Sequence, residues 1–448
     1  MDAAASPRET ITYGTTLGDV LVRHVVSGRA HIIGAGLAGL SAAVRLAGHG
    51  ISVIVHEAAG YAGGRCRSYF DHKLDCEIDN GNHLVLSGNH ATRDFLRLIG
   101  ADNTIDIHSP ADIPFVDLAD GTRWSVRPDK GRIPWSLMSS RNRVPGASLS
   151  DYLQSCRIMW AKDNQSVKDV ISTGGALWRR FWAPVIVAVT NTDPAAAGAV
   201  PMRQVFAETF AKGEAACRPV FFPQGLGRSL VLPAVDFVTA MGGELRFNHR
   251  LTRVHKSNGT LAALEFGKDR IDLSENDCVI SAVPAAVAQK MFDGIDGPNA
   301  FSPIVNGHFR INQVFNVPPL LGVVGGTAEW LFSRGDVVSV TASAATSLVN
   351  LPSATVAVRF WRDIQAAYGL VDVPMPSFRI VKEKRATFLQ TPDQLSRRPD
   401  RRTQWHNLYL AGDWTDTGLP ATIEGSIRSG ASAASAALVK LNKIGGNT

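Results

Sequence analysis

The chain has 448 residues, of which 45% are hydrophobic and 19% are charged, and its formal net charge is +6. This length is too great for one ordinary hydrophobic core and predicts two domains or one large composite, while the composition excludes a disordered or fibrous protein. Basic residues are scattered, and we interpret the densest patch, residues 397–402, as a solvated loop, so no nucleic-acid partner is expected.

The sequence lacks the features of a membrane-spanning, disulfide-stabilised or secreted protein. No run of about 18 consecutive apolar residues is present, which argues against a spanning helix. The five cysteines form no C-x-x-C pair, which favours a reducing compartment such as the cytoplasm. Charged side chains interrupt residues 1–28, and we interpret this segment as an N-terminal extension.

The first ordered elements are expected between Ala30 and Glu57. Residues 31–36 form a short apolar run that ends in glycines, and the apolar positions from Leu37 onward have helical spacing. Residues 49–57 form a second apolar run, which ends in an acid. A strand, a helix and a second strand in this order predict a parallel sheet covered by helices.

The glycines between the first strand and the first helix match a dinucleotide-binding pattern. Gly34, Gly36 and Gly39 have the spacing G-x-G-x-x-G, which allows a tight turn, a pyrophosphate close to the backbone and close helix packing. Glu57 follows Gly39 by 18 positions, near the roughly 20 expected of the acid that binds a ribose hydroxyl. An acid here favours FAD or NAD over NADP. A glycine-rich turn without a ligand is the alternative.

Two stretches after this unit carry polar residues in unusual places. Gly63, Gly64 and Arg65 form a second glycine turn with a cation suited to phosphate, although a plain surface loop is the alternative. In CEIDNGNHLV, residues 76–85, five polar or glycine residues interrupt an apolar run. Such residues are typical of turns, so a surface turn competes here with a functional cluster.

The middle of the chain predicts helices and strands in mixed order. Residues 86–110 have helical character, and a mixed region extends to about residue 215 and contains a cluster of Trp160, Trp178 and Trp182. A helix and two strands are expected over 230–266, a strand and a helix over 277–292, and another mixed segment with several strands over 296–400.

The last elements also have the pattern of a nucleotide site. Residues 407–414 predict a strand that ends at Asp413, whose carboxylate can bind ribityl hydroxyls or serve as a turn residue. A long helix rich in small residues is predicted from Pro420 to residue 441. Free N–H groups at its start can donate to a flavin carbonyl, and the candidate residues there are Ala421, Thr422 and Ile423.

These elements predict an α/β fold with a Rossmann-type FAD-binding domain and a mixed α+β substrate-binding domain built from two insertions. The FAD-binding domain is expected to consist of three segments, residues 29–115, 216–295 and 405–448. The insertions, residues 116–215 and 296–404, supply the second domain.

Taken together, GAGLAGL, Glu57, GGR and AGDW…GLPATIEGSIRSG resemble the flavin-containing amine oxidase and phytoene desaturase superfamily from residue 30 to 441. DNGNH and NTDPAAA (191–197) resemble signatures of the squalene-associated FAD-dependent desaturases, the hydroxysqualene dehydroxylases of hopanoid biosynthesis. Asn82 stands where that family usually has Gln, and Ala59 and Tyr61 stand where it often has arginines. FFPQGLGR (221–228) is closer to other desaturases.

The resemblance implies an FAD-dependent oxidoreductase that removes the allylic hydroxyl of hydroxysqualene reductively to give squalene. It places Gly81 against the isoalloxazine, Asn82 and His83 toward the substrate cavity, and Val254 in the cofactor site. His83 is the first candidate for the acid that protonates the hydroxyl, with Asp79 to orient it or to tune its pKa, and a structural histidine is the alternative. The sequence does not identify the electron donor.

The implied substrate is nearly insoluble, so we expect the protein to associate peripherally with the inner face of the cell membrane. Residues 317–326, with Trp330, Leu331 and Phe332 nearby, are a candidate contact, although core packing is the preferred interpretation. A carotenoid desaturase or an amine oxidase is the alternative enzyme, and a non-catalytic flavin-binding or lipid-binding protein is the third possibility.

Overall fold

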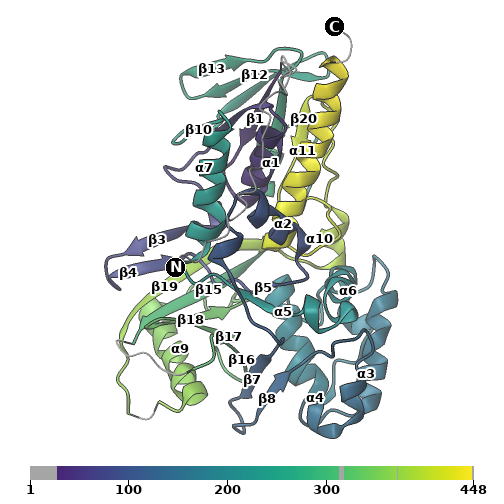
Figure 1. The fold of residues 1–448 in the computed structure, drawn as a ribbon, viewed down its shortest axis with the longest axis vertical. Helices are drawn as coiled ribbons and strands as arrows, with labels where there is room; N and C mark the ends of the chain where they lie inside the picture. The colour runs from purple at the N-terminus through teal and green to yellow at the C-terminus, as the bar shows by residue number, and fades with distance from the viewer. Residues whose placement is uncertain (1–27, 312–316, 371, 446–448) are drawn as a thin grey trace, which may run out of the picture.

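This computed structural model describes residues 28–311, 317–370 and 372–445, so the expected N-terminal extension lies almost wholly outside the described residues. Figure 1 shows an elongated molecule with a parallel sheet and its helices at one end. A larger, mostly antiparallel sheet and a helical region form the other end. This arrangement confirms the predicted α/β fold class. The exact domain boundaries stay a prediction.

Five parallel strands form the sheet that carries the glycine fingerprint. In spatial order they are β10 (Glu244–Arg246), β2 (Ser52–His56), β1 (Arg29–Ile33), β14 (Cys278–Ser281) and β20 (Leu408–Leu410). The central strand β1, its neighbour β14 and the edge strand β20 are almost completely buried, as expected for a parallel sheet covered on both faces. Strands from distant parts of the sequence thus become neighbours.

Helices cover one face of this sheet. α1 (Leu37–Gly48) and α11 (Ile423–Gly445) pack along each other, and α2 (His90–Leu98) and α7 (Leu232–Ala240) complete the layer. A methyl group at Gly430 would lie 2.1 Å from the Ala38 carbonyl oxygen, and the Ser41 hydroxyl donates to the Ile427 carbonyl at 2.8 Å. The many small residues of α11 therefore permit close contact between the two helices.

The opposite face is covered differently from the prediction of helices alone. A three-stranded antiparallel sheet, β11 (Arg253–Ser257), β12 (Thr260–Phe266) and β13 (Asp269–Asp272), packs there with α8 (Ala285–Met291). The predicted helices of residues 230–292 are confirmed as α7 and α8, and the predicted strand between them as β14. Residues 230–266 contain three strands, β10, β11 and β12, where two were predicted, and β13 was not predicted.

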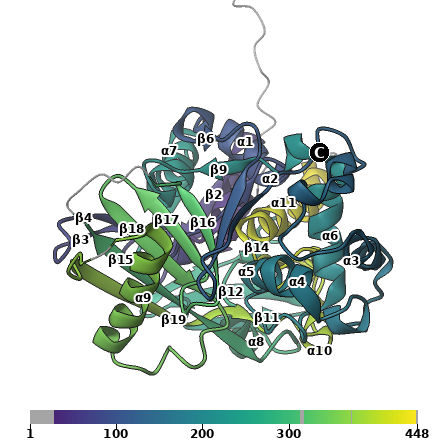
Figure 2. The ribbon, with the colours of Figure 1, turned by 90° about the horizontal axis from the view of Figure 1, so that it is seen from below.

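A seven-stranded sheet forms the floor of the second half. Its helix α9 (Ser353–Tyr368) covers one face, where Val338, Val340 and Ala342 pack against the helix. Ser339 and Thr341 alternate with them and point to the opposite face, toward the parallel sheet. In the view from below of Figure 2, α9 lies on the viewer's side of the sheet. In spatial order the strands are β19 (Ser377–Phe388), β15 (Phe301–Arg310), β18 (Val337–Ala342), β17 (Trp330–Arg334), β16 (Leu320–Val324), β7 (Ile113–Asp117) and β8 (Arg123–Val126).

A helical region lies beside this sheet. Its helices are α3 (Leu149–Ser155), α4 (Gly175–Leu177), α5 (Ala183–Thr190) and α6 (Ala199–Glu208), and α10 (Pro392–Ser396) lies nearer the parallel sheet. The short strands that link the two halves are β3 (Ser68–Asp71), β4 (Cys76–Asp79), β5 (Val85–Leu86), β6 (Asp106–Ile107) and β9 (Pro219–Phe221).

The structure corrects two predictions made from the sequence and confirms a third. Trp182 is buried, but Trp160 is 74% exposed, so the tryptophans form no single cluster. Strand β16 is buried throughout, which confirms the preferred interpretation of its stretch as part of the core. The final helix begins at Ile423 rather than Pro420, because the Thr422 hydroxyl accepts from the Gly425 N–H at 3.2 Å and caps the helix there.

Candidate functional site

Two of the three fingerprint glycines, Gly34 and Gly39, occupy positions where only glycine fits. Gly34 has φ +108°, and a methyl group on it would lie 2.9 Å from the Ala282 carbonyl oxygen. A methyl group on Gly39 would lie 1.9 Å from the Gly34 carbonyl oxygen, whereas one on Gly36 would meet no atom within 4 Å. Open space thus lies beside Gly36 at the start of α1, where no side chain caps the helix. This geometry fits a pyrophosphate at a helix N-terminus.

Glu57 lies at the end of β2 with its carboxylate held beside the glycine turn. Oε2 accepts from the Ala35 N–H at 2.7 Å, and Oε1 accepts from the Ala59 N–H at 2.8 Å. Each carboxylate oxygen retains a second lone pair that a ribose hydroxyl can use. Val254, which was predicted to contact the cofactor, lies in β11. Its side chain is partly buried against the apolar cluster between the small antiparallel sheet and the parallel sheet.

The second glycine turn rests directly on the first. The Gly63 N–H donates to the Ala35 carbonyl at 2.8 Å, and a methyl group on Gly64 would lie 3.3 Å from the Gly36 Cα. Both glycines have positive φ, 102° and 55°. The close approach of two backbones explains why this turn requires glycine.

Arg65 connects this turn to the C-terminal segment. Its Nη2 lies 2.8 Å from Asp413 Oδ1, and its Nη1 donates to the Ala386 carbonyl. The carboxylate of Asp413 is nearly buried, and its charge raises the pKa of Arg65. The guanidinium was expected to bind phosphate; in the structure it is directed toward Asp413, so the two predicted residues act as a pair.

A buried arginine that sequence analysis placed in a solvated loop organises the same segment. Arg398 is only 8% exposed, and its guanidinium donates to the carbonyl oxygens of Thr415 at 2.5 Å and Leu419 at 2.7 Å. It also donates to the Asp413 carbonyl at 3.3 Å. These bonds fix the loop between β20 and α11. The prediction of a solvated loop was wrong for Arg398 but is confirmed for the exposed Arg401 and Arg402, because neighbouring arginines in the sequence do not share one environment.

The start of α11 is only partly available for a ligand. The Ala421 N–H donates to Gln390 Oε1 at 3.1 Å, and the hydroxyl of Thr422 caps the helix. Gln390 in turn donates from its backbone to the Thr192 hydroxyl at 2.9 Å. Of the three predicted contacts, Ala421 therefore has its N–H engaged by protein, which leaves Thr422 and Ile423 as the proposed cofactor contacts.

The stretch 76–85 is not a surface turn. Asn80 and Gly81 are buried, and a methyl group on Gly81 would lie 3.2 Å from Asn306 Nδ2. Asn82 Nδ2 donates to Thr341 Oγ1 at 3.2 Å, and that hydroxyl donates to Asn306 Oδ1 at 2.9 Å. The stretch is therefore bound to the open face of the seven-stranded sheet, and Asn82 is directed at β18.

Asp79 does not hydrogen-bond to His83. Its Oδ1 accepts from the Leu226 N–H at 3.0 Å and from the Ser68 hydroxyl at 2.5 Å, and its Oδ2 pairs with Arg334 Nη1 at 2.8 Å. Asp79 therefore does not orient His83 through a hydrogen bond, and tuning of the His83 pKa by its charge is the role that stays a prediction. Burial lowers the pKa of His83 to about 4, and the charge of Asp79 opposes this shift only in part. The imidazole is therefore neutral at pH 7.

A cavity of about 1060 Å³ lies between α5 and the edge of the large sheet. This volume is near the upper end of the roughly 300–1,000 Å³ usual for ligand sites. Asn191, in the NTDP stretch, fixes one side of it, because its amide donates to the Ser302 carbonyl at 3.1 Å and to Thr387 Oγ1 at 3.0 Å. Its Oδ1 accepts from the Ala344 N–H at 2.6 Å.

Glu329 lines this cavity and was not found by sequence analysis. Its Oε2 accepts from the Ser343 N–H at 2.7 Å, and burial raises its pKa to about 7 although Ser343 favours the charged form. Other charged residues on the cavity wall are Arg179, Asp193 and Arg359. Residues 320–342 contain two acids, Glu329 and Asp336, and Glu329 stands directly before the apolar start of β17 at Trp330.

Comparisons with known proteins identify the family of the chain. Residues 37–438 match the family described as Flavin containing amine oxidoreductase. The chain is 43% identical to Hydroxysqualene dehydroxylase of Zymomonas mobilis over 91% of this chain and 98% of that protein. A 15-cis-phytoene desaturase of Glycine max is 21% identical over 89% of this chain and 77% of that protein.

Among solved structures, cyclohexylamine oxidase from Brevibacterium oxydans superimposes with a TM-score of 0.66 at 13% identity. The superposition covers 93% of this chain and 99% of that one. At this identity the likeness establishes the fold alone.

Proposed function

The chain belongs to the Flavin containing amine oxidoreductase family, in the group that includes the hydroxysqualene dehydroxylases, and we propose that it converts hydroxysqualene to squalene by reductive removal of the hydroxyl group. It is an oxidoreductase, and FAD is its cofactor. The observation that carries the proposal is the protonatable carboxyl of Glu329 in a large cavity. Hydrogen bonds of Asn191 and Gln390 connect the wall of this cavity to the start of α11.

The proposed cofactor contacts come from three parts of the chain. Gly34, Gly36 and Gly39 bring the backbone to the pyrophosphate, and Glu57 accepts from the ribose. The remaining contacts come from Gly64, Arg65, Gly81, Val254, Asp413, Thr422 and Ile423. When bound in its reduced form, FAD supplies the hydride that replaces the lost hydroxyl group.

The protein must also supply a proton, because hydroxide is a poor leaving group. Glu329 suits this role better than His83. A carboxyl with a pKa near 7 is about half protonated at neutral pH, whereas a histidine with a pKa near 4 carries almost no proton to donate. Protonation lets the hydroxyl leave as water.

Within the described residues, no helix is both long enough and apolar enough to cross a membrane. A long isoprenoid alcohol partitions into lipid, so the proposed substrate has to be collected from a membrane. We therefore propose a peripheral association with the inner membrane face, as for proteins that lie on rather than span a bilayer.

The test is a single turnover without oxygen. Photoreduced enzyme mixed with detergent-solubilised hydroxysqualene is expected to regain the absorbance of oxidised flavin and to form squalene, with photoreduced free FAD as the control. Oxidised enzyme mixed with phytoene tests the desaturase alternative, in which the flavin would become reduced. Fully flavinated enzyme that forms no squalene would refute the proposal, and inertness toward both substrates would favour a binding protein.

A further inference from the structure

Residues 127–162 present the most exposed large apolar side chains of the described part of the chain. Trp160 is 74% exposed, Trp135 69%, Leu153 65% and Met138 63%, and Ile133 adds a fifth at 57%. Large apolar side chains in contact with water on a folded surface mark an interaction site when they gather in one region. Two tryptophans with most of their surface in water are especially informative, because tryptophan is favoured at membrane–water interfaces.

The same 36 residues carry most of the chain's excess positive charge. They contain seven basic and two acidic residues, a net charge of +5 against +6 for the whole chain. Both acids are engaged in local turns, since Asp129 accepts from Ser136 and Asp151 accepts from the Ser148 N–H. Within the described structure no ion pair neutralises five exposed cations, which are Lys130, Arg132, Arg141, Arg157 and Lys162.

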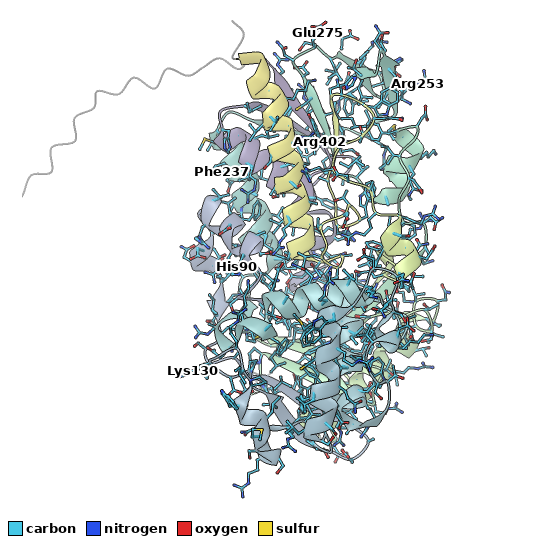
Figure 3. The ribbon with its side chains drawn as sticks, turned by 90° about the vertical axis from the view of Figure 1, so that its right-hand side faces the viewer. His90, Lys130, Phe237, Arg253, Glu275 and Arg402 are labelled. Atoms are coloured by element: carbon cyan, nitrogen blue, oxygen red, sulfur yellow. The ribbon has the colours of Figure 1, made fainter. Side chains whose placement is uncertain are left out.

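The segment is held firmly on the protein. In its first half, the Asp129 carbonyl accepts from the Glu214 N–H at 2.7 Å. In its second half, Trp182 Nε1 donates to the Ser155 hydroxyl at 2.8 Å, and Arg203 donates to the Ala161 carbonyl at 2.6 Å. The exposed apolar side chains therefore extend from a fixed backbone. Figure 3 shows Lys130 on the outside of the molecule, in the half opposite Glu275 and Arg253.

The segment also adjoins the wall of the cavity. Val144 and Ile158 pack in one buried cluster with Leu177 and Phe181. These last two residues flank Trp178 and Arg179, which line the cavity that contains Glu329. The segment and this part of the cavity wall thus belong to one packed unit.

We propose that residues 127–162 are the surface that docks on an anionic membrane, with Trp135 and Trp160 inserted among the lipid headgroups and the unpaired cations bound to lipid phosphates. The inference rests on the proposed function, because a lipid-soluble substrate requires a membrane contact. Unpaired Lys and Arg beside exposed tryptophans complement anionic headgroups. A second copy of this chain is a poorer occupant, since a symmetric contact would bring two +5 surfaces together.

The experiment is flotation of flavin-loaded protein with vesicles of phosphatidylcholine alone or mixed equally with phosphatidylglycerol. Wild-type protein is expected to bind the mixed vesicles. The double variant W135S/W160S should bind about tenfold more weakly or worse, because two buried apolar contacts are lost. The double variant R141E/R157E should lose the preference for phosphatidylglycerol.

Matched controls change equally exposed side chains elsewhere. V358S alters an apolar residue that is 58% exposed on α9, and K268E reverses a surface charge, and neither should weaken vesicle binding. Flavin content and Tm show that each variant is folded. Binding that survives both surface double variants, or weakens equally in the controls, would overturn the proposal. So would light scattering that shows a wild-type dimer which W135S/W160S converts to a monomer.

Activity separates this inference from the proposed function. All variants should reduce detergent-solubilised hydroxysqualene at the wild-type rate, whereas W135S/W160S should be slow only with substrate embedded in vesicles. If the wild-type enzyme is inactive on detergent-solubilised hydroxysqualene, the proposed function is refuted, while the flotation result on membrane binding still stands. A double variant that matches wild type on vesicles refutes the docking surface while the reaction stands.

Discussion

Replacing Glu329 with Gln tests the proposed proton donor most directly. The amide is nearly isosteric, and its oxygen can still accept from the Ser343 N–H, which lies 2.7 Å from Oε2 in the wild type. The variant keeps the local geometry but has no acidic proton. The rate at which hydroxysqualene reoxidises the reduced enzyme should therefore fall by about 10²–10⁴-fold, the usual contribution of general acid catalysis.

The pH dependence gives a second signature of the same group. The acid must be protonated, so the wild-type rate should be constant below a pKa of about 7 and should fall about tenfold per pH unit above it. E329Q should lose this decline. H83A should keep it, because the pKa of His83 is lowered to about 4 and the imidazole is neutral throughout this range.

Stability provides an independent check that needs no substrate. Burial raises the folded-state pKa of Glu329 from 4.5 to about 7, so the folded protein binds the proton more tightly than the unfolded chain. This contribution is fully present below pH 4.5 and is lost as pH rises to about 7. It amounts to at most about 3 kcal/mol of unfolding free energy. E329Q should therefore gain stability relative to wild type across this window.

The assay is anaerobic stopped-flow of photoreduced enzyme, with rates divided by bound flavin and with unfolding free energies measured by urea titration. E329Q that retains the wild-type rate per flavin and the same decline above pH 7 would refute the reasoning. A large loss of rate in H83A without loss of flavin would return the acid role to His83.

Three further outcomes follow from the cofactor site. The purified protein should be yellow, and denaturation should release intact FAD. Glu57→Ala should weaken FAD binding by about 1–3 kcal/mol in titrations, because a charged hydrogen-bond acceptor is lost, and unchanged affinity would contradict the role of Glu57. Gly81→Val should reduce bound flavin or turnover while the fold survives, since a methyl group there already meets Asn306 Nδ2 at 3.2 Å, and normal flavin content with normal rate would place the ring elsewhere. Arg398→Met should lower Tm and the FAD occupancy together, because the buried carbonyls of Thr415 and Leu419 lose their hydrogen-bond donor, which costs about 1–3 kcal/mol of stability for each carbonyl. The control Arg401→Met, at an exposed position, should change neither quantity.

The part of the site that sequence analysis found is local in the chain. Gly34, Gly36 and Gly39 act within one turn, and Glu57 lies one strand away, so their spacing alone indicates a dinucleotide. The structure brings these residues together as expected. The polar stretch 79–83 was also recognised, but its partners Asn306 and Thr341 lie more than 200 residues further along and have no pattern of their own.

The β-α-β start, the fingerprint and the family resemblance can all be read from the sequence, because they depend on short-range periodicity and on motif spacing. Which charged groups are buried depends instead on how distant segments pack together. Arg398 and Glu329 resemble surface residues in the sequence, yet burial fixes the first to three backbone carbonyls and raises the pKa of the second to about 7. Trp160 and Trp182 are equally apolar, and packing places one in water and the other in the core. Desolvation depends on neighbours in space, which residue type and spacing do not specify.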